Sequence, residues 1–333
     1  MRAVLGSALG SFEHYAIAPW TCPAPRAGEV QVDVHSAGVT FVDALIASGR
    51  HQVKVALPFI PGNEVSGVVV AVGDGVKRLA VGDRVACVGV GGKYAERIVV
   101  PATAALRIPE RMSFDEGAVF RGGFGCAYYA LHQAAHVKPG ESVLVLGAAG
   151  AVGLAAVQLA KAMGARVLAS ASSEEKRHLA TRAGATATID THADDWRARV
   201  RDWTDGRGLD VVVDPVGGTA TERAFRALGV GGRHLVIGFA SGTIPSLPLN
   251  LALVKNASVI GVELSKFEQQ YPDLGAANDR ALVELYERGA ITAPPIAHRF
   301  PFEGFREALT LAASGKSAGS IVLQIGNRDA TSE

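Results

Sequence analysis

The sequence predicts an α/β protein in which a doubly wound parallel sheet accompanies a smaller, β-rich domain. Four branched apolar residues at 143–146 suit a strand buried on both faces, and they run directly into a glycine-rich turn. From this strand to residue 238, strand-like and helix-like stretches alternate, which is typical of βαβ units. Before residue 110, short strands follow one another with a polar/apolar period of two. These observations predict two domains in a chain of 333 residues.

The N-terminal part is expected to form a barrel or sandwich of roughly a hundred residues. Its expected strands lie at 1–5, 29–36, 68–73, 83–88 and 95–100. Ser113 and Glu116 then have the spacing of a capping box, which predicts that helices lead into the parallel sheet.

The parallel sheet is expected to follow the glycine-rich turn in regular order. Its expected strands lie at 143–146, 166–170, 186–189, 210–214 and 233–238, and its expected helices at 173–183, 194–202 and 220–228. Helices near 278–288 and 302–314 precede a last strand at 321–325, which is expected to return to the N-terminal domain. We therefore predict a β-rich domain at 1–118, a nucleotide domain at 119–258 and a return segment at 259–333.

The turn after the first parallel strand is the strongest candidate for a ligand site. Gly150 would let a pyrophosphate approach the backbone, and Gly153 would let the following helix press against the sheet. The N-terminus of that helix would offer unpaired N–H groups to the phosphates. We therefore expect a dinucleotide to bind at Ala149, Gly150, Ala151 and Val152, with a purely structural glycine turn as the alternative.

Composition argues against several other classes of protein. Lys and Arg number 33 against 32 Asp and Glu, a net charge of +1 that does not call for nucleic acid or an anionic membrane. We find no signal peptide and no long uncharged apolar stretch, so no membrane partner and a cytoplasmic location are expected. Cys22, Cys87 and Cys126 are far apart and form neither a disulfide framework nor a CxxC zinc motif.

Four blocks of sequence together resemble the medium-chain dehydrogenase/reductase superfamily, and within it the zinc-free quinone oxidoreductase group, which includes the zeta-crystallins. The blocks are AGVTFVD at 37–43, LPFIPGNEVSGVV at 57–69, AAGAVG at 148–153 and DPVGG at 214–218. The resemblance covers nearly the whole chain. It implies a GroES-like catalytic domain built from both chain ends, a Rossmann dinucleotide-binding domain between them, and an active site in the cleft between the two domains.

The resemblance also implies that no metal takes part. Zinc-dependent relatives would carry a cysteine where Thr40 stands and a histidine where Asn63 stands, and zinc needs three or four such ligands. Without a Lewis acid, hydride addition must yield an anion that is already delocalised. This favours a quinone, or the β-carbon of an α,β-unsaturated carbonyl, as the small-molecule substrate.

The expected cofactor is NADPH. An NAD enzyme normally carries an acid at the end of the second strand, where the resemblance places Ala171. Ser172 and Ser173 can donate hydrogen bonds to a 2′-phosphate, and Lys176 would supply a counter-charge. In the alternative interpretation Ser173 is only a helix cap, Lys176 a surface charge, and Glu174 reaches the ribose. The lack of a tyrosine at Thr191, which some relatives use, weakens the phosphate pocket.

Three residues of the β-rich domain are candidates for substrate chemistry. Relatives often carry an Asn at Thr40 and a Tyr at His51, and both positions face the nicotinamide. Here Thr40 and His51 could donate hydrogen bonds to a carbonyl, and His51 could supply a proton. Asn63 is expected to orient substrate or nicotinamide. The alternatives are a helix cap for Thr40, an exposed loop residue for His51 and a turn residue for Asn63.

The sequence thus predicts an NADPH:quinone reductase. The alternatives are an enone or enoyl-thioester reductase and an NADPH-binding sensor or structural protein without turnover. The backbone of Gly238, Phe239 and Ala240, after the last clear strand, is expected to pass the nicotinamide. Residues 258–263 could extend the sheet across a homodimer by edge pairing.

Overall fold

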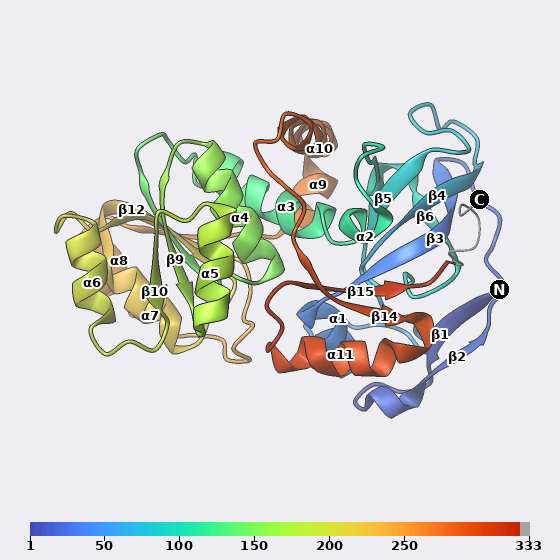
Figure 1. The fold of residues 1–333 in the computed structure, drawn as a ribbon, viewed down its shortest axis with the longest axis horizontal. Helices are drawn as coiled ribbons and strands as arrows, with labels where there is room; N and C mark the ends of the chain where they lie inside the picture. Colours follow the sequence, from blue (N-terminus) through green and yellow to red (C-terminus); the bar gives the residue numbers. More distant parts are fainter. Residues whose placement is uncertain (327–333) are drawn as a thin grey trace. The chain divides into compact units, whose positions relative to one another are not determined.

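The computed structural model describes residues 1–326, and the chain divides into two compact units (Figure 1). Unit 1 comprises Met1–Gly122 together with the segment from Ala293 onward, and unit 2 comprises Gly123–Thr292. Residues 259–292, expected in the return segment, belong to unit 2, and a strand at Ser258–Gly261 joins the parallel sheet of that unit.

Within residues 1–326, unit 1 consists mainly of strands and contains three α-helices. Its strands are β1 (Arg2–Gly6), β2 (Tyr15–Pro19), β3 (Glu29–Val39), β4 (Glu64–Val72), β5 (Arg84–Val88), β6 (Arg97–Pro101), β7 (Ala105–Arg107), β14 (Ile296–Pro301) and β15 (Ser320–Gln324). Its helices are α1 (Phe41–Ala47), α2 (Phe114–Gly117) and α11 (Phe305–Ser314). A capping box formed by Ser113 and Glu116 begins α2, as the sequence predicts.

Strand β3 organises unit 1. Its Val30, Val32 and Val34 alternate with more exposed residues and are buried in the core, which is the predicted period of two. It pairs with β4 and β6, and also with β15, so the last strand returns to the N-terminal domain as expected. The strand path runs β14-β15-β3-β4-β5-β7 with β6 beside β3, and the described strands do not close into a barrel.

Unit 2 alternates strands and helices. Its strands are β8 (Ser142–Leu146), β9 (Arg166–Ala171), β10 (Ala187–Asp190), β11 (Leu209–Asp214), β12 (Leu228–Val236) and β13 (Ser258–Gly261). Its helices are α4 (Ala151–Ala162), α5 (Glu174–Ala183), α6 (Trp196–Trp203), α7 (Thr219–Arg226), α8 (Asn250–Lys255), α9 (Leu264–Gln270) and α10 (Pro272–Glu287). Helix α3 (Arg121–Tyr128) begins at the boundary of the units and continues as a π-helix at Tyr129–Ala134.

All pairs in the six-stranded sheet of unit 2 are parallel, in the order β10-β9-β8-β11-β12-β13. Every residue of β8 is buried, as predicted for a strand covered on both faces. Leu144 and Leu146 pack with Trp196 of α6 and Phe225 of α7 on one of these faces. The strand order reverses direction between β8 and β11, which is the point where sheets of this kind bind ligands.

No helix within residues 1–326 is both long enough and apolar enough to span a bilayer.

Candidate functional site

The glycine-rich turn lies at the carboxyl end of β8 and leads into α4. Gly150 is the N-cap of α4 and its position lacks a side-chain cap, so the first N–H groups of the helix have no side-chain acceptor. A Cβ on Gly153 would lie 2.2 Å from the carbonyl oxygen of Gly147, so only glycine allows this close approach of helix and turn. Gly150 and Ala151 are exposed. This arrangement can receive an anionic group at the helix N-terminus.

The end of β9 carries the residues predicted to select the cofactor. Ala171 is buried, and its carbonyl oxygen accepts hydrogen bonds from Thr191 N (3.2 Å) and Arg177 Nη1 (3.3 Å). Ser173 is the N-cap of α5, and its hydroxyl accepts from Lys176 N at 3.3 Å. The hydroxyl proton of Ser173 is therefore still available to a ligand. Ser172 and Ser173 are exposed and Lys176 is partly exposed.

Glu174 is the acid that the alternative interpretation directs to the ribose. Its Oε1 lies 3.4 Å from Nε2 of His178, one turn further along α5. Both side chains are exposed, so this pair is held weakly.

The loop after β11 lies against the glycine-rich turn, and the segment after β12 lies against that loop. A Cβ on Gly147 would lie 2.9 Å from Val216, which places the loop at 215–218 against the turn. Gly238 and Ala240 donate backbone hydrogen bonds to the carbonyl oxygens of Asp214 (3.4 Å) and Pro215 (3.1 Å). The predicted segment 238–240 therefore lies beside that loop and is only partly buried.

Thr40 of unit 1 forms the N-cap of α1. Its hydroxyl donates to Oδ2 of Asp43 at 2.7 Å, its backbone N–H donates to the same oxygen at 2.6 Å, and it accepts from Asp43 N at 3.3 Å. This is a complete capping box, the arrangement of the alternative interpretation. The Thr40 proton is committed to Asp43 whenever that carboxyl group is ionised.

His51 and Asn63 each bond to backbone in unit 1. Nδ1 of His51 accepts from Val53 N at 3.1 Å, so the neutral ring carries its proton on Nε2. Burial lowers the pKa of His51. Oδ1 of Asn63 accepts from Gly91 N at 3.0 Å, and the amide nitrogen has no hydrogen-bond partner among residues 1–326. Each side chain therefore has an N–H group available to a ligand.

Three ionisable side chains, those of Asp43, Glu64 and Lys93, lie near Thr40 and Asn63. Burial raises the pKa of Asp43 to about 6, although hydrogen bonds from Thr40 and the Asn63 backbone act to lower it. Burial and the nearby charge of Asp43 raise the pKa of Glu64 to about 7. Lys93 is 7% exposed, donates to the Gly91 carbonyl oxygen at 2.8 Å, and has its pKa lowered by burial. The capping-box spacing of Thr40 and Asp43 was the available sequence signal.

The described residues contain no group of three or more His, Cys, Asp or Glu side chains that could hold a metal ion.

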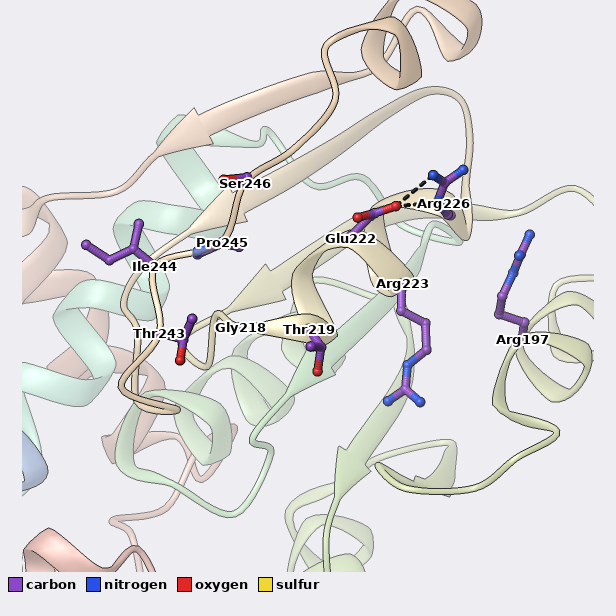
Figure 2. A pocket seen from close by; sticks show the side chains of 10 residues that line it. All are labelled: Arg197, Gly218, Thr219, Glu222, Arg223, Arg226, Thr243, Ile244, Pro245 and Ser246. Carbon is purple, nitrogen blue, oxygen red and sulfur yellow. Dashed lines mark hydrogen bonds and ion pairs between the residues drawn. The ribbon is translucent and has the colours of Figure 1, made fainter.

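A surface cavity of about 440 Å³ lies along α7 in unit 2 (Figure 2). It is lined by Arg197, Gly218, Thr219, Glu222, Arg223, Arg226, Thr243, Ile244, Pro245 and Ser246. Arg226 pairs with Glu222 at 2.6 Å, and Arg223 stacks 4.6 Å from the ring of Trp196. The cavity includes none of the residues predicted from the sequence to bind cofactor or substrate.

Comparison with known proteins identifies both parts of the chain. A family model described as alcohol dehydrogenase GroES-like domain matches residues 26–110, and one described as zinc-binding dehydrogenase matches residues 151–277. The chain is 39% identical over 297 residues to quinone oxidoreductase-like protein 2 homolog of Nematostella vectensis, covering 89% of this chain and 81% of the relative.

Solved structures show the same relationship over almost the full length. Escherichia coli quinone oxidoreductase complexed with NADPH has a TM-score of 0.89 and 28% identity, covering 98% of this chain and 100% of that one. The CurK enoyl reductase has a TM-score of 0.88 and 27% identity, covering 97% and 98%. The predicted resemblance is thereby confirmed: the chain is an oxidoreductase of the medium-chain dehydrogenase/reductase superfamily and belongs to its zinc-free quinone oxidoreductase group.

Proposed function

We propose that this oxidoreductase transfers a hydride from NADPH to a quinone. The main support for NADPH as the cofactor comes from the end of β9. There a buried alanine replaces the acid that is usual in NAD enzymes, and two exposed serines and Lys176 follow it. Similarity to an E. coli quinone oxidoreductase complexed with NADPH supports both the cofactor and the substrate class. NADPH would supply the hydride.

Unit 2 offers the groups that would hold the cofactor. We assign the pyrophosphate to the uncapped N-terminus of α4 at Ala149, Gly150, Ala151 and Val152. We assign the 2′-phosphate to Ser172, Ser173 and Lys176, and the nicotinamide to the partly exposed backbone of 238–240. The close approach at Gly153 brings the first turn of α4 against the carbonyl oxygen of Gly147.

Unit 1 offers the groups that would act on the substrate. Hydride addition to a quinone leaves a delocalised anion, which needs a hydrogen-bond donor and then a proton. We assign these tasks to the Nε2–H of His51 and the amide of Asn63, because both have an N–H group free of protein acceptors. The Thr40 hydroxyl can donate to a substrate oxygen only when Asp43 is protonated.

A second candidate activity is reduction of a conjugated double bond. The similarity to the CurK enoyl reductase favours it. Hydride would add to the β-carbon of an enone or enoyl thioester, and the same donors would serve the resulting enolate. A third possibility, an NADPH-binding sensor without turnover, uses the same cofactor site.

Parallel assays of NADPH oxidation test these alternatives. A small quinone and a medium-length 2-enal are compared, each with and without a metal chelator. Turnover of the quinone alone supports the proposal, and faster turnover of the enal assigns the chain to double-bond reduction. NADPH binding without turnover of either substrate contradicts both activities, and a loss of turnover with chelator contradicts the metal-free assignment.

We also propose a homodimer joined through β13. This strand is at the end of the sheet, pairs with β12 on one side, and leaves Val259 49% exposed. Leu249, Leu253 and Val254 on or beside α8 are 72–80% exposed. A second copy could pair with the strand edge and cover these side chains. A monomeric mass by light scattering at micromolar concentration would contradict this assembly.

A further inference from the structure

Asp214, the last residue of β11, is almost completely buried and accepts four hydrogen bonds through its side chain. Its Oδ1 accepts from the backbone N–H groups of Val216 (2.9 Å) and Gly217 (2.8 Å). Its Oδ2 accepts from Thr221 Oγ1 (2.6 Å) and His234 Nε2 (3.0 Å). One carboxylate therefore joins the loop after β11, the first turn of α7 and the neighbouring strand β12.

His234 is committed to this carboxylate. It is completely buried, and its Nδ1 has no hydrogen-bond partner among the described residues. Because an ionised Asp214 can only accept, Nε2 of His234 carries a proton and donates it to Oδ2. Thr221 is also buried, at 4% exposure. Although burial alone would raise it, the pKa of Asp214 is lowered by hydrogen bonds from His234, Thr221 and Gly217.

The loop that Asp214 holds is in turn bonded to the segment expected at the nicotinamide. The carbonyl oxygen of Asp214 accepts from Ile237 N (2.9 Å), and that of Val216 accepts from Ser241 N (2.8 Å). Gly218 N donates to the Thr243 carbonyl oxygen at 3.0 Å, and these two residues lie close together in Figure 2. A displacement of the loop at 215–218 would therefore displace residues 237–243.

The same loop also touches the glycine-rich turn. A Cβ on Gly147 would lie 2.9 Å from Val216, and a Cβ on Gly217 would lie 2.8 Å from Phe239. Gly217 adopts a φ of +71°, which glycine tolerates best. The loop is thus packed between the turn after β8 and the segment after β12.

We propose that Asp214, with Thr221 and His234, is a positioning residue for the cofactor: it holds the loop at 215–218, and through it residues 238–240, in the arrangement that receives the nicotinamide. This inference rests on the proposed NADPH-dependent function. In this proposal Asp214 does not contact the reacting atoms and acts through the backbone at 238–240.

Asp210 provides a matched control on the same strand. Its Oδ2 accepts from Ser142 N and Ser142 Oγ, both at 2.7 Å, and so links β11 to β8. It lies near the amino end of β11, at the opposite edge of the sheet. Both aspartates stabilise the sheet, but only Asp214 lies beside the predicted cofactor loops.

The test compares Asp214→Ala, Asp210→Ala and the milder Thr221→Val in the full chain. NADPH affinity is measured by fluorescence titration, hydride transfer by single-turnover oxidation at saturating NADPH, and stability by thermal unfolding. Both aspartate variants should lose stability. Asp214→Ala should weaken NADPH binding at least about tenfold and slow hydride transfer, whereas Asp210→Ala should change neither by more than about twofold. Thr221→Val should weaken binding by about threefold.

Each outcome decides the inference. Equal NADPH affinity and hydride-transfer rates in Asp214→Ala and Asp210→Ala would show a purely structural role and overturn it. If Asp214→Ala does not fold, Thr221→Val decides: unchanged affinity and rate overturn the inference, and a loss supports it. If the unmodified chain binds no NADPH, the proposed function fails instead, which the same titration reveals before any variant is made.

Discussion

Both units of the molecule bury acidic side chains beside their candidate ligand-binding residues, but they treat these acids differently. In unit 2, Asp214 accepts four hydrogen bonds, and its pKa is lowered although burial opposes ionisation. In unit 1, Asp43 bonds mainly to Thr40, and Glu64 accepts from Gly122 N at a long 3.3 Å. Burial therefore raises the pKa of both acids in unit 1. In unit 1, burial outweighs the hydrogen bonds that each acid receives, whereas in unit 2 the hydrogen bonds to Asp214 outweigh burial.

The difference matches the two tasks that we propose for these regions. A carboxylate that stays ionised can hold backbone N–H groups in a fixed arrangement at any physiological pH, which suits a cofactor-binding loop. Acids that titrate near neutrality couple the surrounding hydrogen bonds to pH, which suits a region where a proton is transferred.

The largest effect should come from His51→Phe. Replacing a proton donor typically lowers turnover about 100-fold or more, and the structure leaves the Nε2–H of His51 without a protein acceptor. NADPH affinity should be unchanged, because the assigned cofactor residues all lie in unit 2. Steady-state kinetics and NADPH titration measure the two quantities. His14→Phe, at an exposed histidine of the same unit, is the control. Unchanged turnover in His51→Phe would remove this residue from the mechanism.

Glu64→Gln should change how stability depends on pH. The pKa of Glu64 rises from 4.5 to about 7 on folding, so its protonated form stabilises unit 1 below about pH 4.5, and this stabilisation is lost as the pH rises through 7. Because one pKa unit corresponds to about 1.4 kcal/mol, the variant should gain about 2–3 kcal/mol relative to the unmodified chain between about pH 5 and about pH 8.

Urea unfolding at the two pH values measures this gain. Glu110→Gln, at an exposed glutamate of unit 1, should show no such pH dependence. If both variants show the same change in the free energy of unfolding between the two pH values, Glu64 ionises as readily as a surface acid. The contrast with Asp214 would then be wrong.

Two lysines extend the comparison to cations. Lys93 in unit 1 is buried with its pKa lowered, whereas Lys176 in unit 2 is partly exposed in the first turn of α5. Lys176→Ala should reduce the ratio of NADPH to NADH affinity about tenfold, through loss of a charge-assisted contact to the 2′-phosphate. Titration with both nucleotides measures the ratio. Arg182→Ala, in the last turn of the same helix, should leave it unchanged; an unchanged ratio in Lys176→Ala refutes the assignment.

Features specified by neighbouring residues could be predicted from the sequence. The strand at 143–146, its glycine-rich turn and α5 with Ser173 and Gly184 as caps all follow from local patterns. Unit boundaries that depend on pairing between distant strands were harder to predict from the sequence. Residues 259–292 belong to unit 2, and the pairing of β13 with β12, which lies more than 20 residues earlier in the chain, joins the start of this segment to that unit.

Hydrogen bonds between distant segments were not predicted, because their partners are far apart in the sequence. Asp214 meets His234 and Thr221 only because β12 lies beside β11 and α7 follows the loop. Likewise, Asn63 accepts from Gly91, which is 28 residues further along the chain. Periodicity indicates which face of an element is buried, but it does not indicate which polar groups meet there.

The smallest expected effect concerns the capping box at Thr40, whose partners are close in sequence. Thr40→Val removes both the hydroxyl that donates to Asp43 and the acceptor for Asp43 N, and it should cost about 1 kcal/mol of stability. Thr40→Ser keeps both hydrogen bonds, and its stability should be nearly unchanged.

Turnover of the same variants tests whether Thr40 also acts on the substrate. If Thr40 only caps α1, Thr40→Val retains full turnover once corrected for the folded fraction. If the Thr40 hydroxyl donates to the substrate when Asp43 is protonated, turnover falls in Thr40→Val and recovers in Thr40→Ser. The loss in Thr40→Val is then greatest below about pH 6, the pKa of Asp43. Turnover measured across pH for the two variants therefore separates the cap from the donor, because a lost cap alone has no reason to follow the titration of Asp43.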